Sequence, residues 1–282
     1  MKRDTAPIFR TALATTEEDL CAAQALRYDV FVRELGGGGA MVDHERGLEQ
    51  DRFDPFFDHL LLFDDSVGAV VGVYRMLKPE QAEIVGQYYS EDEYDLSKLR
   101  NSGRRMLELG RSCLHSSYRG GTAMHHLWAG LAKYVAKHRI EILFGVASLH
   151  GTNIHSLAKP LSLLHHRYLA PQHLRVTAKP PNCRNMNLIP EAELDRRAAM
   201  VSIPSLIKAY LRLGGVVGDV EHGLDELLAV ATELGDRGIV VAYDLEALGE
   251  LGQDQRTHAL EHLVDVHVGH DVRAPVRCQQ AV

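Results

Sequence analysis

The sequence predicts an α/β protein of the α+β kind, with a mixed, mostly antiparallel sheet flanked by helices. Two observations carry this expectation: a pair of apolar runs that can form a hairpin, and two later apolar runs of strand length separated by a strongly helical segment. With 282 residues, 45% of them hydrophobic and 24% charged, the chain can bury a full core around such a sheet.

The first helix is expected at residues 16–34. Thr15 or Thr16 followed by three acidic residues has the form of a helix cap, and apolar residues then recur at helical spacing as far as Phe31. Residues 36–39 are all glycine and should end the helix, because they cost too much backbone entropy to remain helical. A mobile polar segment is expected from there to Asp54.

The strands are expected to follow this helix. Residues 59–63 and 69–76 are rich in Leu and Val and are separated by turn formers, which predicts an antiparallel hairpin. A strand at 140–147 should pair beside another at 106–114. The other elements expected are helices at 122–137, 154–166 and 205–213 and a strand at 174–178, which gives the order β-α-β-β-β-α-β-α-β.

Charge and composition exclude several classes of protein. The net charge of −7 arises largely from residues 221–282, where twelve Asp and Glu stand against four Arg and no Lys, and no basic stripe suited to nucleic acid is present. The apolar runs are far shorter than the roughly 20 residues that cross a bilayer, so a cytoplasmic protein is expected. The four cysteines are widely spaced, which predicts free thiols and no metal site.

The segment 107–123 carries the strongest functional signal. An acyl thioester on phosphopantetheine needs a phosphate site, partners for its amide groups and a polar group near its carbonyl. Arg119, Gly120 and Gly121 fall where a turn would open a helix, whose free N–H groups and dipole attract phosphate. A Gly-Gly pair alone would indicate only a tight turn, but this pair follows a strand that carries Glu108 and Arg111.

Glu108 needs an explanation, because an unpaired carboxylate buried on a strand is costly. Glu108 and Gly110 should lie on one side of the strand, and Leu107 and Leu109 on the other. Chemistry at a thioester is one explanation for the acid. A structural ion pair between Glu108 and Arg75 or Arg27 is the alternative.

Three segments give a specific resemblance: 107–112 (LELGRS), 118–121 (YRGG) and 143–148 (LFGVAS). They resemble the bacterial ornithine-acyl carrier protein N-acyltransferases, which belong to the GNAT superfamily. Further matches at 86–90, 162–171 and 206–215 extend the resemblance over roughly residues 8–219. It implies the GNAT acyl-CoA N-acyltransferase fold and the first step of ornithine lipid biosynthesis, in which L-ornithine receives a 3-hydroxyacyl group to give lyso-ornithine lipid.

The same resemblance implies the donor and its site. The donor would be the phosphopantetheine thioester of acyl carrier protein, with no permanently bound cofactor. The residues expected to hold it are Leu109, Gly110, Arg119, Gly120, Gly121, Thr122 and Ala123. Backbone N–H groups near Leu109 would stabilise the oxyanion of the tetrahedral intermediate.

Four motifs of the front half, at 27–31 (RxxVF), 51–54 (DxFD), 74–77 (YRML) and 108–111 (ExxR), also resemble the acyl-homoserine lactone synthases. Both families join an acyl carrier protein thioester to an amine derived from an amino acid, so the residues that they share are expected to serve that chemistry. Glu108 would be the general base, with Arg111 beside it as a catalytic residue. The expected substrate-binding residues are Arg27, Phe31, Asp51, Asp54 and Arg75, although the three arginines suit structural ion pairs equally well.

Two alternatives to ornithine acylation remain open on sequence grounds. One is synthesis of an acyl-homoserine lactone, and the other is a protein that binds an acyl carrier without catalysis. In each case an acidic carrier protein should dock on basic residues. The candidates are Lys98, Arg100, Arg104, Arg105, Lys133 and Lys137. Helix 205–213 is a candidate for peripheral contact with the inner membrane, with packing on the sheet as the alternative.

The chain departs from the ornithine family after Asp219. We therefore divide it into a GNAT-type domain at 1–219 and an atypical, acidic, His- and Leu-rich tail at 220–282 that is foreign to the family. A reading-frame change in the gene is our hypothesis for its origin, testable by resequencing. Histidines 258, 262, 267 and 270 are spaced like metal ligands, but no other ligand motif accompanies them.

Overall fold

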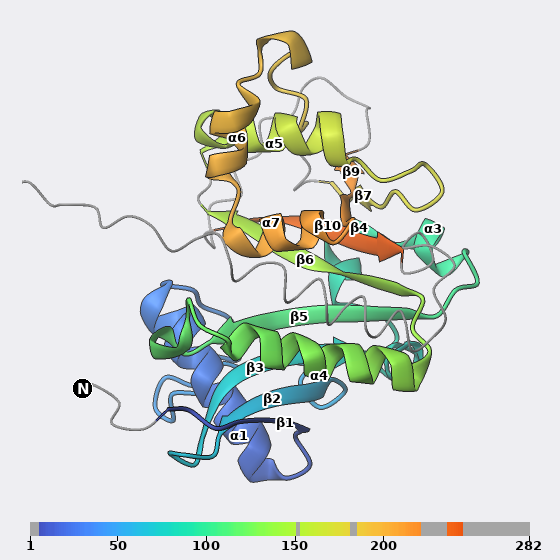
Figure 1. The fold of residues 1–282 in the computed structure, drawn as a ribbon. Coiled ribbons are helices and arrows are strands. Elements are labelled where there is room, and N and C mark those ends of the chain that lie inside the picture. Colours follow the sequence, from blue (N-terminus) through green and yellow to red (C-terminus); the bar gives the residue numbers. More distant parts are fainter. Residues whose placement is uncertain (1–5, 151–152, 181–184, 221–235, 245–282) are drawn as a thin grey trace, which may run out of the picture.

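The structure is a computed structural model of the chain and describes residues 6–150, 153–180, 185–220 and 236–244 (Figure 1). Its strands are β1 (Phe9–Leu13), β2 (Asp58–Asp64), β3 (Ala69–Leu77), β4 (Tyr94–Asp95), β5 (Met106–Leu114), β6 (Ile142–His150), β7 (Thr177–Ala178), β8 (Val216–Val217), β9 (Asp219–Val220) and β10 (Asp236–Asp244). Its α-helices are α1 (Glu17–Arg27), α2 (Pro79–Val85), α3 (Ser97–Arg100), α4 (Ala123–His138), α5 (Ile154–Tyr168), α6 (Arg196–Ser202) and α7 (Ser205–Arg212). Shorter helical turns are η1 (Tyr28–Glu34), η2 (Tyr89–Asp92), η3 (Ser116–Tyr118) and η4 (Glu191–Glu193).

The main sheet has seven strands in the order β1-β2-β3-β5-β6-β10-β8, and a smaller sheet has the order β4-β7-β9. The neighbours in the main sheet are antiparallel except β5 and β6, which are parallel. The predicted class, a mixed and mostly antiparallel sheet with flanking helices, is therefore confirmed.

Helices cover both faces of one part of the main sheet: α4 packs on β1, β2 and β3 from one side, and α1 packs on β2, β3 and β5 from the other (Figure 1). Side chains alternate between these faces along each strand. On β2, Leu60 and Leu62 belong to the core under α4, whereas Leu61 packs with Ala23 of α1. Helices α5, α6 and α7 follow β6 in the sequence. They lie on the side of the β5–β6 pair that faces away from β1, β2 and β3 (Figure 1).

The first helix begins where its cap was expected. The side chain of Thr16 accepts a hydrogen bond from the backbone N–H of Asp19, and Asp19 accepts one from the backbone of Thr16, which forms a capping box. The helical backbone continues past Arg27 as the π-helical turn η1, so the two elements together span most of the predicted range 16–34. Gly37 then packs against Phe31, leaving no room for a Cβ atom.

Strand β5 has an irregularity that shapes the site. Val73 of β3 pairs with Cys113 and Arg75 pairs with Gly110, so Tyr74 alone opposes two residues of β5, Arg111 and Ser112. This is a β-bulge, and it puts Arg111 at a φ of 50°, a left-handed conformation that is rare for a residue with a side chain.

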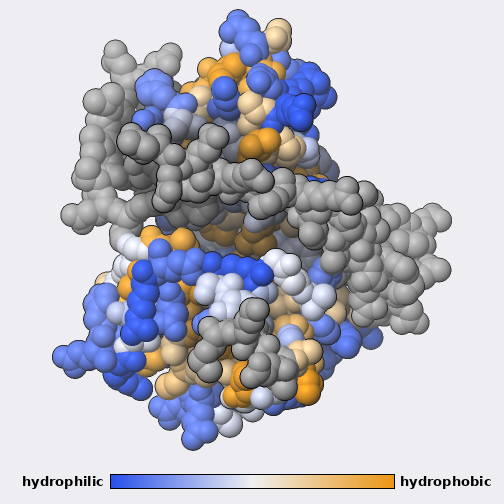
Figure 2. Space-filling model, turned by 60° about the vertical axis from the view of Figure 1, so that its left-hand side comes forward, coloured by the Kyte–Doolittle hydropathy of each residue, from blue (hydrophilic) through white to orange (hydrophobic). Residues whose placement is uncertain are grey.

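Pairing between β5 and β6 covers only the start of each strand. The last registered pair is Glu108 with Phe144, after which the strands diverge (Figure 1). We call the opening between residues 109–114 and 145–150 the wedge. Figure 2, which brings this side forward, shows hydrophobic side chains gathered in a hollow between the part of the molecule below and the part above.

The predicted hairpin, the strand 106–114 and the helices near 122–137, 154–166 and 205–213 are all present within a few residues. The strand predicted at 174–178 is reduced to two residues. In α7 the apolar residues Ile207 and Leu211 are buried in the core, as the alternative of packing on the sheet expects, and peripheral contact of this helix with the membrane stays a prediction. Within the described ranges, no helix has the length and apolarity needed to cross a bilayer.

Residues 236–244 lie beyond the boundary predicted at residue 219, yet they pair with β6 along its whole length as β10. Part of the segment interpreted as foreign therefore supplies a strand to the main sheet. The division of the chain at this point stays a prediction. Histidines 258, 262, 267 and 270 lie outside the described residues.

Candidate active site

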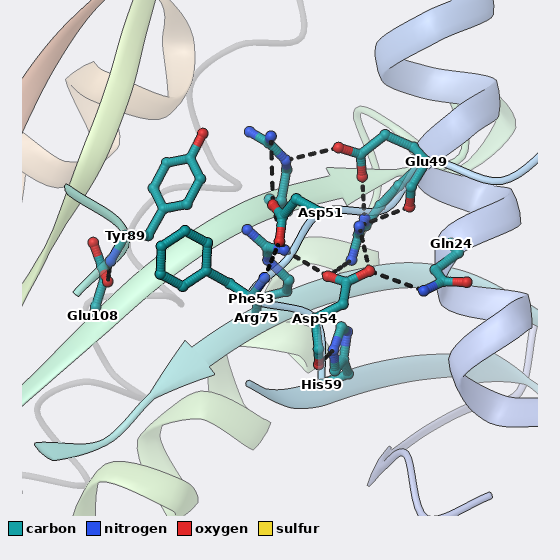
Figure 3. A network of polar contacts seen from close by, with 11 residues as sticks. Gln24, Glu49, Asp51, Phe53, Asp54, His59, Arg75, Tyr89 and Glu108 are labelled. Carbon is teal, nitrogen blue, oxygen red and sulfur yellow. Dashed lines mark hydrogen bonds and ion pairs between the residues drawn. The ribbon is translucent and has the colours of Figure 1, made fainter. Parts of the chain in front are cut away.

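An ion-pair network lies on the α1 side of the sheet, beside the wedge (Figure 3). In this network each arginine is paired with carboxylates. The residues come from α1, from the segment before β2, and from β3 and β5. They are Arg27, Glu49, Asp51, Asp54, Arg75 and Arg111.

Arg27 is the centre of the buried half of this network. Its guanidinium group donates two hydrogen bonds of 2.9 Å to the carboxylate of Asp54, and its Nε atom lies 2.5 Å from the carboxylate of Glu49. A further hydrogen bond of 2.7 Å runs to the backbone carbonyl of Glu49. Gln24, one turn earlier on α1, donates to Asp54 at 2.9 Å. Through these hydrogen bonds Arg27 holds the segment 49–54 against the first helix.

Arg75 and Arg111 extend the network toward the wedge. Arg75 donates to Asp54 at 2.5 Å and to Asp51 at 2.8 Å. Arg111 donates to Glu49 at 3.0 Å and lies 3.8 Å from Asp51. The bulge at Arg111 turns its side chain to this face, so the strained backbone has a clear structural consequence.

Burial divides the predicted substrate-binding residues into two groups. The side chains of Arg27, Arg75 and Asp54 are 0%, 1% and 4% exposed, so they act as a scaffold in this structure. Asp51 and Arg111 are 20% and 31% exposed and can meet a ligand. Two buried arginines hold the carboxylate of Asp54 in this structure, and its expected role as a substrate-binding residue stays a prediction.

The electrostatics of Asp54 agree with this role. Burial alone would raise the pKa of its carboxyl, but hydrogen bonds and charge from Arg27 and Arg75 outweigh burial and lower the pKa to about 2. Asp54 is therefore ionised across the physiological range. An acid with so low a pKa is a poor proton acceptor, which excludes Asp54 as the general base.

Glu108 has the opposite environment. Its side chain is buried and pairs with neither Arg75 nor Arg27, contrary to the structural alternative considered from the sequence. Instead its two carboxylate oxygens accept hydrogen bonds of 2.7 Å from the backbone N–H groups of Tyr89 and Ser90, and the Ser90 hydroxyl donates to it as well. Burial outweighs these bonds and raises the pKa of Glu108 to about 7.

Aromatic rings surround the exposed end of Arg111. Its guanidinium carbon lies 5.8 Å from the ring centre of Phe31 and 5.4 Å from that of Tyr89. Rings at these distances stabilise a cation and keep water from one side of it. Phe31 was predicted as a site residue and does lie beside Arg111, whereas Tyr89 was not.

Three contributors to this site were missed from the sequence, namely Glu49, Tyr89 and Ser90. Tyr89 and Ser90 lie in the family-like segment 86–90, which was noted without a role. The signal that could have identified them is the need of buried Glu108 for donors. Glu49 carries no local signal, since its partners Arg27 and Arg111 are distant in sequence.

The predicted phosphate turn, residues 119–123, follows directly on η3. Gly120 has a φ of 74°, which favours glycine, and the side chain of Thr122, the N-cap of α4, makes no capping hydrogen bond. Arg119 donates to the carbonyl of Leu114 at 3.0 Å and forms an exposed ion pair with Glu34 of η1. The turn thus joins a helix N-terminus that its N-cap side chain leaves uncapped to a cation whose present partner is an exposed carboxylate.

The basic residues considered for carrier docking lie elsewhere. Lys133 and Lys137 are near the C-terminal end of α4, whereas the turn is at its N-terminal end (Figure 1). Lys133 follows Ala123 by ten residues, about 15 Å along a helix. Arg100 and Arg105 already pair with Glu91 and Glu80. Docking of an acidic carrier protein on this set stays a prediction.

The geometry brings together a buried carboxyl with a pKa near neutrality, a half-buried cation and carboxylate pair, and a wedge that leads to a helix N-terminus. Together these groups can orient a charged amine, take its proton and receive an extended donor with a phosphate at one end.

Comparisons with known proteins identify the family of the chain. Residues 26–129 match the family model described as an acetyltransferase (GNAT) domain. An L-ornithine N(alpha)-acyltransferase of Rhodobacter capsulatus is 52% identical over 75% of this chain and 83% of its own length. Proteins of the same name from Brucella abortus and Rhizobium meliloti are 39% and 38% identical, over 73% and 75% of this chain and 76% and 74% of their own lengths.

Among solved structures, a CoA-dependent acyl-homoserine lactone synthase with SAM and isopentyl-CoA is similar at 13% identity and a TM-score of 0.47. It covers 92% of this chain and 90% of its own. That likeness is too distant to carry an argument. The sequence relatives and the domain match do carry one: the chain is an acyltransferase with a GNAT domain and belongs to the family of L-ornithine N(alpha)-acyltransferases.

Proposed function

We propose that this protein transfers a 3-hydroxyacyl group from acyl carrier protein to the α-amine of L-ornithine and so forms lyso-ornithine lipid. The observation that carries the proposal is the position of Glu108, a buried carboxyl with a pKa of about 7, at the point where β5 leaves β6. The names of the relatives supply ornithine as the acceptor.

Glu108 is the proposed general base. The α-amine of an amino acid is protonated at neutral pH and must lose a proton before it attacks. A carboxylate with a pKa near 7 is better matched to that transfer than one with an ordinary pKa near 4. The proton passes to Glu108 directly or through one water, and the neutral amine nitrogen then attacks the thioester carbonyl.

Arg111 and Asp51 are proposed to orient ornithine. Arg111 offers its exposed guanidinium edge to the α-carboxylate, and Asp51 offers a carboxylate to the side-chain ammonium. The buried partners Glu49, Asp54 and Arg75 hold these two groups in place, so each stands ready before the substrate arrives. Arg27 belongs to the same support.

The donor is proposed to lie in the wedge. Its phosphate meets the turn 119–123, and its amide groups meet the edge of β5 that β6 leaves uncovered after Glu108. Backbone N–H groups near Leu109 and Gly110 stabilise the oxyanion while the C–N bond forms. The C–S bond then breaks, and the thiol of the carrier leaves with a proton while the amide remains on ornithine.

The test is an incubation of the purified chain with 3-hydroxyacyl carrier protein and either L-ornithine or S-adenosylmethionine, followed by mass spectrometry. The proposal expects N-acylornithine from the first mixture only. A lactone from the second would establish acyl-homoserine lactone synthesis, and no product from either would leave only carrier binding to be measured.

A further inference from the structure

A second group of polar side chains lies on the opposite face of the sheet from the ion-pair network. It consists of Tyr74 of β3, Ser112 of β5, Trp128 of α4 and Tyr210 of α7, which we call the hydroxyl cluster. The hydroxyl groups of Tyr74 and Tyr210 are hydrogen-bonded to each other, and the rings of Trp128 and Tyr210 stack with centres 6.2 Å apart.

The hydroxyl cluster sits at the bulge that opens the wedge. Ser112 is one of the two β5 residues opposed by Tyr74, and it lies close enough to the Tyr74 hydroxyl to affect its pKa. Tyr210 reaches the group from α7, which lies on the far side of the β5–β6 pair (Figure 1). The cluster therefore joins the two sides of the wedge.

The Nε1 atom of Trp128 is buried without a hydrogen-bond partner among the described residues. The Oγ atom of Ser112 is buried as well, and its one hydrogen-bonding neighbour among the described residues is the Tyr74 hydroxyl, so it keeps capacity to accept a further hydrogen bond. An indole N–H can only donate, whereas a serine hydroxyl can both donate and accept. Buried groups of this kind are normally paired, so the missing hydrogen bonds are expected to come from a ligand.

The thioester donor can offer such a group from its arm or from its acyl chain. The arm carries amides, and the uncovered edge of β5 already provides backbone donors and acceptors for them. The surroundings of the hydroxyl cluster are apolar, with Leu109, Leu127 and Leu131 in the same core, as an acyl chain requires. A plain alkyl chain there would leave the Trp128 N–H unpaired and the remaining acceptor capacity of Ser112 Oγ unused.

We propose that Ser112 and Trp128 form a subsite that binds the hydroxyl group of a 3-hydroxyacyl chain and so selects it over an unsubstituted chain. This inference rests on the proposed function, because it takes the donor to be an acyl thioester in the wedge. The Trp128 N–H donates to the hydroxyl oxygen, and the hydroxyl hydrogen is donated to Ser112 Oγ. Leaving one such buried partner unmade costs a factor of about 5 to 100 in binding.

The test compares two acyl carrier proteins whose chains have equal length, one 3-hydroxylated and one unsubstituted. Their affinities are measured without ornithine, and kcat/KM is measured with it, for the wild type, Ser112→Ala and Trp128→Phe. We expect each variant to lower the preference for the hydroxylated carrier about tenfold. Ser202→Ala, which removes an exposed hydroxyl on α6, is the control and should keep the preference of the wild type.

The outcomes separate this inference from the proposed function. An equal loss with both carriers would assign Ser112 and Trp128 to the arm and overturn the hydroxyl subsite. A changed binding preference without acylation of ornithine would support the subsite and reject the acceptor. No preference in the wild type, or no binding of either carrier, would overturn the subsite. Ser112→Ala removes only one oxygen atom, so it keeps the test valid if Trp128→Phe fails to fold.

Discussion

The backbone N–H of Ser90 lies 2.7 Å from the carboxylate of Glu108, and the Ser90 hydroxyl donates to the same oxygen. This contact joins η2 to β5 at the residue where the pairing of β5 with β6 ends. It also explains how Glu108, which is 1% exposed, can stay buried although no ion pair holds it among the described residues. Three hydrogen bonds from Tyr89 and Ser90 compensate part of the free energy needed to bury the charged carboxylate. The part that they do not compensate raises the pKa of Glu108.

The first prediction concerns the chemical role of Glu108. Glu108→Gln keeps the size of the side chain but cannot accept the proton of the amine, so kcat should fall by a factor of about 10² to 10⁴. Binding of the acyl carrier should change little, which titration calorimetry can check. Glu83→Gln on the exposed side of α2 is the matched control. Turnover of Glu108→Gln at the wild-type rate would remove Glu108 from the role of base.

The second prediction concerns pH. A base with a pKa of about 7 loses its proton as pH rises, so kcat should increase about tenfold per pH unit below 7 and level off above it. The Ser90 hydroxyl lowers the pKa of Glu108, so Ser90→Ala should move this midpoint to higher pH. Steady-state rates between pH 5 and 9 test both statements. A midpoint that stays fixed in Ser90→Ala would show that another group titrates.

The same raised pKa affects stability with a definite sign. Folded Glu108 holds its proton up to about pH 7, whereas an unfolded glutamate releases it near pH 4.5. Between these values the native state binds more protons, so the contribution of Glu108 to stability falls as pH rises. Urea unfolding should therefore show a destabilising contribution above pH 7 that is absent below pH 4.5. Its absence from Glu108→Gln is the control.

The third prediction concerns the buried ion pairs of Arg27. Arg27→Met would leave the carboxylates of Glu49 and Asp54 buried with fewer partners, and we expect a loss of about 3–5 kcal/mol in the free energy of unfolding. Arg33→Met, which removes an exposed ion pair with Asp29 one turn away, should cost within about 0.5 kcal/mol. Equal losses in the two variants would contradict the scaffold role of Arg27.

Asp54 should show the corresponding dependence on acid. Its pKa is lowered from 3.8 to about 2, so the stability that it contributes is fully present above pH 4 and is lost as pH falls through 2. Arg27→Met removes the main stabilising partner and should raise the pKa of Asp54. Acid unfolding of that variant should therefore begin at higher pH than in the wild type.

The sequence predicted those parts of the fold that depend on local pattern. The strand 106–114 agrees with β5 at both ends, and the cap at Thr16 is where it was expected, because periodicity and capping act over a few residues. The strand β10 was not predicted. It lies in the segment after Asp219 that was interpreted as foreign to the family, and antiparallel pairing with β6 tolerates many sequences that form an extended strand.

The sequence predicted which residues belong to the candidate site better than it predicted their roles. Glu108 and Arg111 were identified, but the division of the acids and arginines into buried support and exposed contacts depends on three-dimensional packing. Arg27 meets Glu49 over 22 residues and Arg111 meets Glu49 over 62. Pairs at such separations leave no periodic trace in a single sequence.

The fourth prediction concerns the phosphate turn. Arg119 pairs with Glu34 in the absence of a donor, so a phosphate must compete with that carboxylate. Arg119→Ala should weaken binding of the acyl carrier about tenfold or more, whereas Glu34→Ala should strengthen it because the cation is released. Titration calorimetry at low ionic strength measures both effects. Opposite signs are expected, and a loss in both variants would instead indicate that the pair supports the turn.

The last prediction compares two glycines, Gly110 and Gly145, at the closed end of the wedge, where β5 and β6 begin to diverge. A Cβ atom on Gly145 would lie 2.2 Å from the carbonyl oxygen of Leu109, so Gly145→Ala must push β5 and β6 apart and should cost about 1–3 kcal/mol of stability. A Cβ atom on Gly110 would meet nothing within 4 Å. Gly110→Ala should therefore fold normally, as judged by its unfolding midpoint.

The two glycines should differ in the opposite way in function. The space beside Gly110 is where the proposed thioester lies, so a methyl group there should raise KM for the acyl carrier while stability is unchanged. Gly145→Ala should lose activity only in proportion to its loss of folded protein. If Gly110→Ala binds the carrier as tightly as the wild type, the thioester does not pass along this part of β5, and the proposed path of the donor through the wedge is wrong.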